Sequence, residues 1–473
     1  MDLVGRKLER ETFDHCLSSS ESKLIAVYGR RRVGKTFLIR NYLAKHMVFE
    51  VSALHNGDMQ DQLTHFNNTI KRTNKLYDMI GQPSSWLAAF AILSKYLDTK
   101  KSKKKKVIFL DELPWFDTPR SKFLTAFENF WNSYCTRRND IIVIICGSAA
   151  SWMIKKILKN KGGLHNRVSE RIRLMPFKLR ETEAFLKAKG IKWSQYDITR
   201  LYLITGGIPY YIDAVRKGES VVQFVDRSCF KKDGLLTTEY HELFKSLFDN
   251  SERHYKLIEA LYDKKSGLTR TELLNRAKMP SGGTLSTTLH ELEESGFIET
   301  HIPYKGKKTK ALYKLTDPFI LFYLKFMSPG SKQKKWVNII NSPSWKSWSG
   351  LAFERLCFYH IEEIRKALKI EVIENDISAW QAKDKTSGAQ IDLVIDRADS
   401  TTNICEIKFY QAEFTITKEY TKKLRNKVEL FSSLPSNKKK NPFITMITPF
   451  GVKRNEYYLE LVQSEVVMED LFE

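Results

Sequence analysis

Gly29-Arg30-Arg31-Arg32-Val33-Gly34-Lys35-Thr36 decides the fold of this 473-residue chain. The stretch has the spacing G-x-x-x-x-G-K-T, whose glycines allow consecutive backbone N–H groups to turn inward around a polyphosphate. In such a loop Lys35 reaches the β- and γ-phosphates, and Thr36 offers its hydroxyl to Mg²⁺. The residues that we expect to contact a nucleotide are Gly29, Arg30, Arg31, Arg32, Val33, Gly34, Lys35, Thr36 and Phe37.

The segments on either side of this loop support the same interpretation. Residues 24–28 form a short apolar run typical of a buried strand, and residues 35–43 have helical spacing. The loop would then lie at the N-terminus of a helix, where the helix dipole favours anions. We therefore expect a P-loop α/β domain with a mainly parallel sheet that binds ATP and Mg²⁺.

A second apolar strand, residues 107–110, ends in Asp111 and Glu112. A strand of this kind delivers Asp111 to the Mg²⁺ shell beside the loop, and Glu112 can orient or deprotonate the attacking water. A further apolar strand, residues 141–145, leads to Ser148, which is placed to sense the γ-phosphate or the water. The alternatives are solvated acids at the end of an ordinary strand and a serine that only caps a turn.

Length and cysteine usage limit the class of protein. A chain that is 42% hydrophobic over 473 residues can bury more than one core, so two to four domains are expected. Its six cysteines contain no C-x-x-C pair, which suits a reducing compartment. The N-terminus lacks a signal-peptide pattern, and the longest apolar stretch, residues 319–327, is too short to span a bilayer. We expect a cytoplasmic protein without a membrane segment.

The formal net charge of +23 indicates a polyanionic partner, and nucleic acid is the usual one. The positive charge is concentrated in four clusters, each of which could also be a solvated loop. The cluster that precedes the strand at 107–110 is the clearest example of such a loop. The four clusters are residues 103–106, 305–310, 332–335 and 438–440.

Residues 252–327 have the pattern of a winged helix-turn-helix. An amphipathic helix at 254–262 is followed by a capping box, Thr269-Arg-Thr-Glu272, that opens a second helix, and a third helix is expected at 284–295. Segments 297–303 and 310–315 would then pair as a hairpin with a basic tip at 304–309. A basic wing can lie along DNA phosphates. A winged helix used only for protein packing is the alternative.

The last third of the chain contains a second candidate site. Asp392 lies on one predicted strand, and Glu406 and Lys408 lie two residues apart, on one face of the next. Two carboxylates can bind Mg²⁺, and a lysine can position or activate water, which is the chemistry of phosphodiester hydrolysis. Upstream, Glu354 lies on a helix that is expected to start near Gly350, and it could add a ligand. The alternative is a surface salt-bridge ladder.

The chain also resembles a known family over nearly its whole length. It looks like the archaeal-type AAA-like ATPases, related to the signal-transduction (STAND) ATPases, whose C-terminal domain has a restriction-endonuclease-like, PD-(D/E)XK core. The segments that carry this resemblance are residues 29–36, 110–113, 147–148, 205–211 (Thr-Gly-Gly-Ile-Pro-Tyr-Tyr) and 316–319, and the pair 391–392 with 406–408.

The resemblance implies roles for residues that carry little signal by themselves. In this family the Gly-x-Pro turn starts a lid helix and touches the nucleotide, which implies that Gly207 and Pro209 contact adenine or sense the phosphate state. Arg167 falls where the family has an arginine finger, with Arg171 as the second choice. The preceding residue, Asn166, departs from the glycine that is usual there.

We expect a multi-domain α/β architecture in four parts: a P-loop ATPase core at 1–177, a helical lid at 178–250, a winged helix-turn-helix at 251–328, and a linker with a PD-(D/E)XK nuclease-like domain at 329–473. Two functions remain open. One is an ATP-hydrolysing protein that acts on DNA, with Asp392, Glu406 and Lys408 as a Mg²⁺ nuclease centre. The other is an ATP-gated switch that binds DNA or a protein partner, with a silent C-terminal domain. An arginine finger usually acts across a subunit boundary, so a homo-oligomer is possible in both.

Overall fold

The computed structural model describes residues 3–73, 79, 81–101, 104–158, 164, 166–248, 250–328, 335–382 and 389–473. The chain forms two compact units. The first comprises Met1–Pro176 together with Lys245–Asp249 and Thr287–Gly296. The second comprises Phe177–Phe244, Asn250–Ser286 and Phe297–Glu473.

The first unit is built on a five-stranded sheet in which every pairing is parallel, with the strand order β2-β3-β4-β1-β5. This confirms the predicted parallel P-loop core. The interior strands β3 and β4 are buried along their whole length, which explains why they appear in the sequence as continuous apolar runs. The strands are β1 (Lys23–Tyr28), β2 (Met47–Ser52), β3 (Lys106–Asp111), β4 (Ile141–Gly147) and β5 (Glu170–Arg173).

An aromatic core packs beside this sheet. Trp86 lies edge-on to Phe116 and Phe123, with ring centroids 5.3 and 4.9 Å apart, and Phe90 stacks on Phe130 at 5.0 Å. These rings come from segments that follow β2 and β3, and their burial fixes the helices against the strands. The helices of this unit are α1 (Lys7–Ser18), α2 (Lys35–Tyr42), α3 (Met59–Thr73), α4 (Trp86–Thr99), α5 (Phe123–Ser133) and α6 (Ala150–Trp152), the last continued by a π-helix η5 (Met153–Leu158).

The lysine cluster before β3 differs from the expected solvated loop. Residues 102–103 lie outside the described residues. Lys106 is buried as the first residue of β3, and its ammonium lies 2.8 Å from the carboxylate of Asp140. Lys105 donates to the carbonyl oxygen of Glu21 at 2.7 Å. The strand therefore starts within the charged run, because these two cations have partners in the neighbouring segments.

The second unit begins with short helices. They are α7 (Leu179–Ala188), α8 (Gln195–Thr205), α9 (Pro209–Asp213), α10 (Val221–Val225) with a π-helix η6 (Asp226–Phe230), and α11 (Glu239–Leu247). Further along come α15 (Pro318–Phe322) with η8 (Tyr323–Met327), α16 (Trp336–Ile339), α17 (Pro343–Tyr359) and α18 (Ile361–Ala367). The helix that carries Glu354 thus starts at Pro343, earlier than the sequence predicted, because Ser342 caps it by accepting the Trp345 N–H.

Three helices and three short strands occupy the region where the winged-helix pattern was found. The helices are α12 (Ser251–Tyr262), α13 (Arg270–Ala277) and α14 (Gly283–Glu294), and β7 (Ile298–His301) and β8 (Leu312–Leu315) pair antiparallel. The capping box at Thr269 and Glu272 is confirmed, with both reciprocal hydrogen bonds formed. A third strand, β6 (Leu268–Thr269), pairs with β8 and was not predicted.

The wing loop, residues 302–310, makes contacts that the sequence did not indicate. Tyr304 packs against Phe431 with ring centroids 4.9 Å apart, and its hydroxyl donates to the side-chain oxygen of Asn437 at 2.7 Å. The ammonium of Lys305 lies 2.8 Å from the buried carboxylate of Asp396, which Lys440 also contacts. These parts of two basic clusters serve internal ion pairs, so they are not the solvated or phosphate-facing cations that we expected.

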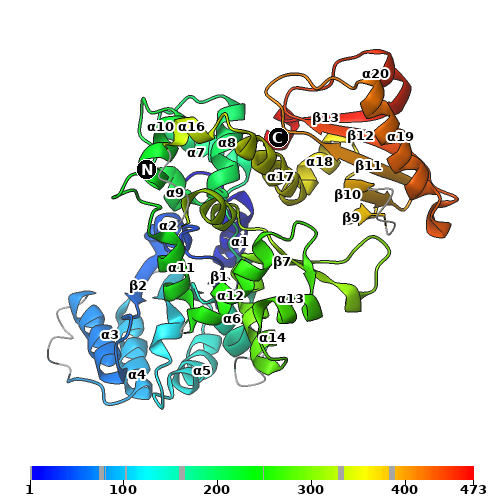
Figure 1. Cartoon of the computed structure of the whole chain (residues 1–473). Coiled ribbons are helices and arrows are strands. Elements are labelled where there is room, and N and C mark those ends of the chain that lie inside the picture. Colours follow the sequence, from blue (N-terminus) through cyan, green and yellow to red (C-terminus); the bar gives the residue numbers. More distant parts are fainter. Residues whose placement is uncertain are drawn as a thin grey trace. The chain divides into compact units, whose positions relative to one another are not determined.

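The C-terminal sheet has the strand order β13-β12-β11-β10-β9 (Figure 1). Strands β9, β10 and β11 pair antiparallel, whereas β11, β12 and β13 pair parallel. Helix α19 (Lys418–Ser432) packs against β12 through Leu424 and Met446. The strands are β9 (Asn375–Gln381), β10 (Gln390–Arg397), β11 (Thr401–Ile407), β12 (Asn441–Thr448) and β13 (Val462–Val467).

One element of this sheet was predicted wrongly. The short apolar run at residues 457–462 predicts a strand, but α20 (Glu456–Leu461) occupies nearly all of it and β13 starts only at Val462. Asn455 caps this helix by accepting the Tyr458 N–H at 3.0 Å. The short apolar run did not distinguish a helix from a strand, and the cap decides the outcome.

The six cysteines are free and buried. Within the described ranges, no helix combines the length and apolar character that a membrane crossing would need.

A buried histidine joins α7 to the end of α17 inside the second unit. His360 accepts the Leu179 N–H through Nε2 at 3.1 Å, and its Nδ1 lies 3.0 Å from the carbonyl oxygen of Leu356. Because Nε2 must be unprotonated to accept, Nδ1 carries the hydrogen and the ring is neutral. Burial lowers the pKa of His360 to about 4.

We expect this histidine to make folding stability depend on pH. Its folded pKa lies below the ordinary 6.5, so the unfolded chain takes up the proton first as the pH falls. The contribution of neutral His360 to the free energy of unfolding is fully present above pH 6.5 and is lost as the pH falls toward 4. Between pH 7 and pH 5 this loss amounts to about 2 kcal/mol. Urea unfolding of the unchanged protein and of His360→Gln at both pH values measures it; equal pH dependence in the two proteins would contradict the assignment.

Candidate active sites

The P-loop backbone has the shape that its glycines allow. Gly29 has φ +138°, and a Cβ there would lie 2.5 Å from the carbonyl oxygen of Leu174, so the position admits only glycine. Gly34 has φ +90° and ψ 26° and is the N-cap of α2. The loop therefore leads directly into the N-terminus of a helix, where backbone N–H groups remain available to an anion.

Lys35 is a buried cation of this loop. The residue is only 6% exposed, and its ammonium donates to the carbonyl oxygens of Gly29 and Arg30, each at 3.0 Å. These bonds fix the ammonium beside the first two residues of the loop. A nucleotide phosphate would meet the positive charge together with the loop amides.

The predicted metal ligands lie side by side. Thr36 Oγ1 donates to Asp111 Oδ2 at 2.9 Å, and Ser52 Oγ donates to the same oxygen at 3.3 Å. A hydroxyl and a carboxylate at the end of a P-loop are the oxygen donors that Mg²⁺ prefers, so the residues present fit this ion. When bound, Mg²⁺ would neutralise charge on the β- and γ-phosphates. Ser52, the last residue of β2, was missed although the end of an apolar strand was a visible signal.

Glu112 is held beside this pair in an unusual backbone conformation. Its φ of +50° and ψ of 47° are left-handed, which is uncommon for a residue other than glycine. Both the N–H and the hydroxyl of Ser148 donate to Glu112 Oε2, at 3.1 and 2.8 Å. The structure therefore brings the two predicted residues together, with Ser148 as a positioning residue for the carboxylate.

Arg6 is a further part of the site that the sequence did not reveal. It is 4% exposed, and its guanidinium donates to the carbonyl oxygens of Val33, in the P-loop, at 2.9 Å and of Met175 at 2.7 Å. One side chain thus fastens the loop to the segment after β5. A single arginine near the N-terminus carries no pattern that would have predicted this.

The arginines that the family resemblance singled out make none of the contacts described above. Arg167 and Arg171 are both exposed in the first unit. Asn166 has φ +56°, so it occupies the left-handed conformation in which glycine is most common and asparagine is tolerated. The departure from glycine at this position therefore preserves the backbone shape.

The Gly-x-Pro turn has its own structural reason. A Cβ on Gly207 would lie 2.1 Å from the carbonyl oxygen of Phe177, and the Gly207 carbonyl accepts the Phe177 N–H at 2.8 Å. Pro209 is the first residue of α9, where its missing N–H costs nothing. Both belong to the second unit, and their role toward a nucleotide remains a prediction.

Residues 3–215 match the family described as "ATPase domain predominantly from Archaea". They form an archaeal-type ATPase domain. Together with the loop geometry, this identifies the protein as an ATPase that binds ATP. The resemblance stated from the sequence is thereby confirmed for the ATPase domain.

The alignments with relatives and solved structures cover more of the chain than this domain. An uncharacterized protein of Methanocaldococcus jannaschii is 24% identical over 433 residues, which cover 90% of this chain and 92% of that protein. The Walker-type ATPase of Pyrococcus abyssi is 17% identical, with a TM-score of 0.51, covering 69% of this chain and 97% of its own; this likeness shows a shared fold. The ORC2 protein of Aeropyrum pernix is 16% identical, with a TM-score of 0.40, and covers 76% of this chain and 96% of its own.

A second group of charged side chains lies outside the ATPase domain, on α17, on β10, and at the end of β11. We call it the acidic site, and it consists of Glu354, Asp392, Glu406 and Lys408. The antiparallel register pairs Leu393 with Cys405, so Asp392 comes opposite Glu406. The ammonium of Lys408 lies 2.8 Å from Glu406 Oε1 and 4.0 Å from Asp392 Oδ2. The structure thus brings together the three residues that the sequence singled out.

Helix α19 adds two partners that were missed. Lys427 lies 2.5 Å from Glu406 Oε2, and the hydroxyl of Tyr420 donates to Glu406 Oε1. Both oxygens of this 3% exposed carboxylate are therefore engaged. Burial would raise the pKa of Glu406, but Lys408 and Lys427 hold it below its usual range.

The other two carboxylates of the acidic site behave differently. Burial, followed by the charge of Asp392, raises the pKa of Glu354 to about 7, and burial followed by Glu406 raises the pKa of Asp392. Burial and mutual repulsion disfavour the state in which both carboxyl groups are ionised. A bound cation would stabilise that ionised state. Across the described part of the chain, no three His, Cys, Asp or Glu side chains form a ready-made metal cluster.

Proposed function

We propose that this ATPase acts on DNA, that its nucleotide state governs the contact, and that the acidic site is a Mg²⁺-dependent nuclease centre. The observation that carries the nuclease part is the meeting of Asp392, Glu406 and Lys408 at one place on two paired strands. That set of groups suits metal-assisted hydrolysis of a phosphodiester.

The DNA part rests on charge and on α12 to α14. A formal net charge of +23 favours a polyanionic partner. We assign residues 251–328 as a winged helix, in which the exposed Ser286 and Thr287 open the third helix and Lys307 and Lys310 remain exposed on the wing loop. Arg270 donates to the Ser286 hydroxyl at 2.8 Å and adds a cation beside this end of α14. These groups could contact DNA phosphates.

A contact inside the first unit supports the coupling of nucleotide state to α14. The guanidinium of Arg173, at the end of β5, donates to the carbonyl oxygens of Glu293 and Glu294 at 3.1 and 3.2 Å, and so binds the C-terminus of this helix. The next residue, Leu174, presses its carbonyl against Gly29 and donates its N–H to Tyr28 at 2.8 Å. Two consecutive residues, Arg173 and Leu174, therefore contact α14 and the P-loop segment, respectively.

Three further roles belong to this proposal. Pro209, with Gly207, contacts the nucleotide from the lid helices. Arg167 stabilises the transition state of a second copy in a homo-oligomer, and its exposure is the feature that such a role requires. Glu112 activates the attacking water, since Ser148 holds its carboxylate in place.

At the acidic site, Asp392 and Glu406 would hold the metal ion, Glu354 would add a ligand, and Lys408 would position the attacking water or the phosphate. The ion supplies Lewis-acid polarisation of the phosphate when bound. Binding would require Glu406 to exchange Tyr420 or Lys427 for the cation. Each of these changes is local to α19.

One observation favours the alternative, an ATP-gated switch with a silent C-terminal domain. Glu406 already has two ammonium groups and a phenol, so it can be a structural ion-pair centre. Incubation of supercoiled plasmid with the protein and Mg²⁺ separates the two functions. Nicked or linear product supports the nuclease, whereas intact plasmid at every metal concentration assigns the switch.

A further inference from the structure

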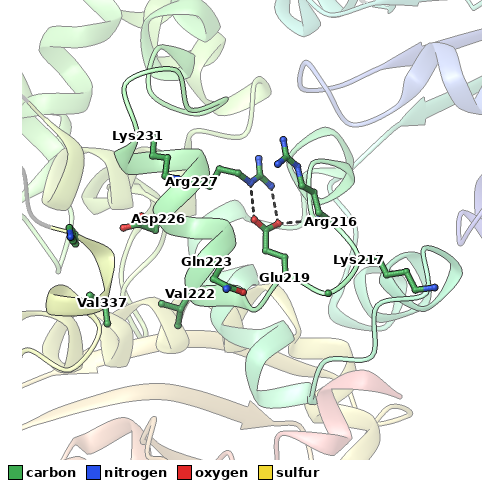
Figure 2. A pocket seen from close by; sticks show the side chains of 11 residues that line it. Arg216, Lys217, Glu219, Val222, Gln223, Asp226, Arg227, Lys231 and Val337 are labelled. Atoms are coloured by element: carbon green, nitrogen blue, oxygen red, sulfur yellow. Dashed lines mark hydrogen bonds and ion pairs between the residues drawn. The ribbon is translucent and has the colours of Figure 1, made fainter.

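A surface pocket of about 560 Å³ lies in the second unit, around α10 and η6, and takes no part in either site above (Figure 2). Its lining holds five cationic and two acidic side chains, which leaves a formal net charge of +3. We call it the cationic pocket. The charged side chains that matter most for ligand binding are those of Arg216, Lys217, Glu219, Arg227, Lys231 and Lys335.

The acidic groups of the pocket are already satisfied. Arg227 donates to both carboxylate oxygens of Glu219, at 2.8 and 2.9 Å, and the backbone N–H of Arg216 donates to the same carboxylate at 3.1 Å (Figure 2). Asp226 accepts the backbone N–H of Trp336 at 2.9 Å. The acids therefore order the pocket, and they leave little negative charge to attract a cation.

The remaining cations have no such fixed carboxylate. Across the described residues, no hydrogen bond or ion pair joins the side chains of Arg216, Lys217, Lys231 or Lys335 to an acid, and all four are exposed. In Figure 2 the guanidinium groups of Arg216 and Arg227 extend on the same side of Glu219, with Lys231 beyond Arg227, while Lys217 extends the other way. Two guanidinium groups over one carboxylate leave a positive charge available to an anion.

The lining indicates which part of an anion would be bound. Among the described residues that line the pocket, none is aromatic, and the apolar side chains are those of Val222 and Val337. A nucleobase would therefore find no stacking partner, whereas phosphate oxygens would find guanidinium and ammonium donors. The cations also come from three separate segments, around Arg216, Arg227 and Lys335, which suits a chain of phosphates better than a single one.

We propose that the cationic pocket binds successive phosphates of a DNA backbone and so extends the DNA-binding surface beyond the winged helix. This rests on the proposed function, in which the ATPase acts on DNA. The binding is independent of sequence, because backbone phosphates carry no base information.

The test measures duplex DNA affinity by fluorescence anisotropy across a range of salt concentrations. The variant is Arg216→Gln with Lys231→Gln, and the matched control is Lys95→Gln with Lys192→Gln, two exposed lysines outside the pocket. Both double variants lower the net charge by two. Loss of two phosphate contacts should reduce the slope of log K against log salt by about 1.8 in the pocket variant and leave the control near the unchanged protein.

Three outcomes would overturn the assignment, and they differ in meaning. Equal slopes in the pocket and control variants remove the pocket but keep DNA binding. No DNA binding by the unchanged protein removes both the pocket and the DNA part of the proposed function. Calorimetric binding of tripolyphosphate that is lost in the pocket variant, with an unchanged DNA slope, shows a small-phosphate site instead. Matched circular dichroism spectra of the two variants exclude misfolding as the cause.

Discussion

Replacing Lys35 by alanine is expected to weaken ATP binding by at least about 100-fold, or about 3 kcal/mol. The ammonium is buried and aimed across the loop by the carbonyls of Gly29 and Arg30. Among the described residues, no other lysine ammonium contacts these carbonyls, so no second lysine takes over its position in the loop. Removing it deletes a charge-assisted bond where water screens poorly.

Isothermal titration calorimetry with ATP and Mg²⁺ measures this loss. Lys45→Ala is the matched control, because Lys45 is an exposed lysine in the short 3₁₀-helix Ala44–His46 after α2. The control should bind ATP like the unchanged protein. ATP affinity retained by a folded Lys35→Ala protein would refute the role of the P-loop.

Replacing Lys408 by alanine is expected to abolish metal-dependent plasmid cleavage, with a loss of at least about 100-fold in rate. Its ammonium lies between Glu406 and Asp392, where the water or the phosphate would be positioned. The variant should still fold, because Lys427 remains 2.5 Å from Glu406 and keeps that buried carboxylate paired. A loss of cleavage would then report on chemistry and not on stability.

Nicking of supercoiled plasmid in Mg²⁺ and in Mn²⁺ measures the effect. Lys453→Ala removes an exposed lysine of the same unit and serves as the control. Equal cleavage by the unchanged protein, the control and Lys408→Ala would assign the activity to another source and end the nuclease hypothesis.

The elements around the nucleotide site could be predicted because their signals are local. The apolar runs of β1, β3 and β4 are buried on both faces; β1 leads into the P-loop at Gly29, β3 ends at Asp111, and β4 precedes Ser148. Asp111 and Thr36 meet because parallel strands and the P-loop share one edge of the sheet. Arg6 could not be found in this way, because its partners are backbone carbonyls, which leave no trace in a sequence.

The acidic site was predictable for a similar reason. A short turn between β10 and β11 fixes the register, and the register brings Asp392 opposite Glu406. Tyr420 and Lys427 come from a helix that packs across the sheet, and sequence spacing does not encode which of its residues reach Glu406. Their effect is large, because they decide how strongly Glu406 is already engaged.

The lysine-rich clusters led to the same wrong expectation in three places. Lys106, Lys305 and Lys440 belong to lysine-rich runs that were treated as solvated or phosphate-facing, yet each forms an ion pair with an aspartate. A run of like charges says nothing about distant partners. The cationic pocket shows the reverse case, since Arg216 and Lys231 belong to no conspicuous cluster and are brought together only by the fold.

The most direct test compares the DNA affinity of the Glu112→Gln variant in two nucleotide states. The affinity is measured once with ATP and Mg²⁺ and once with ADP and Mg²⁺. This variant should bind ATP but hydrolyse it slowly, because the carboxylate held by Ser148 is lost as a base. We predict that the two affinities differ by at least about fivefold, whereas Lys35→Ala shows no difference between the nucleotides. Equal DNA affinity of Glu112→Gln in both nucleotide states would contradict the coupling of ATP to DNA on which the account depends.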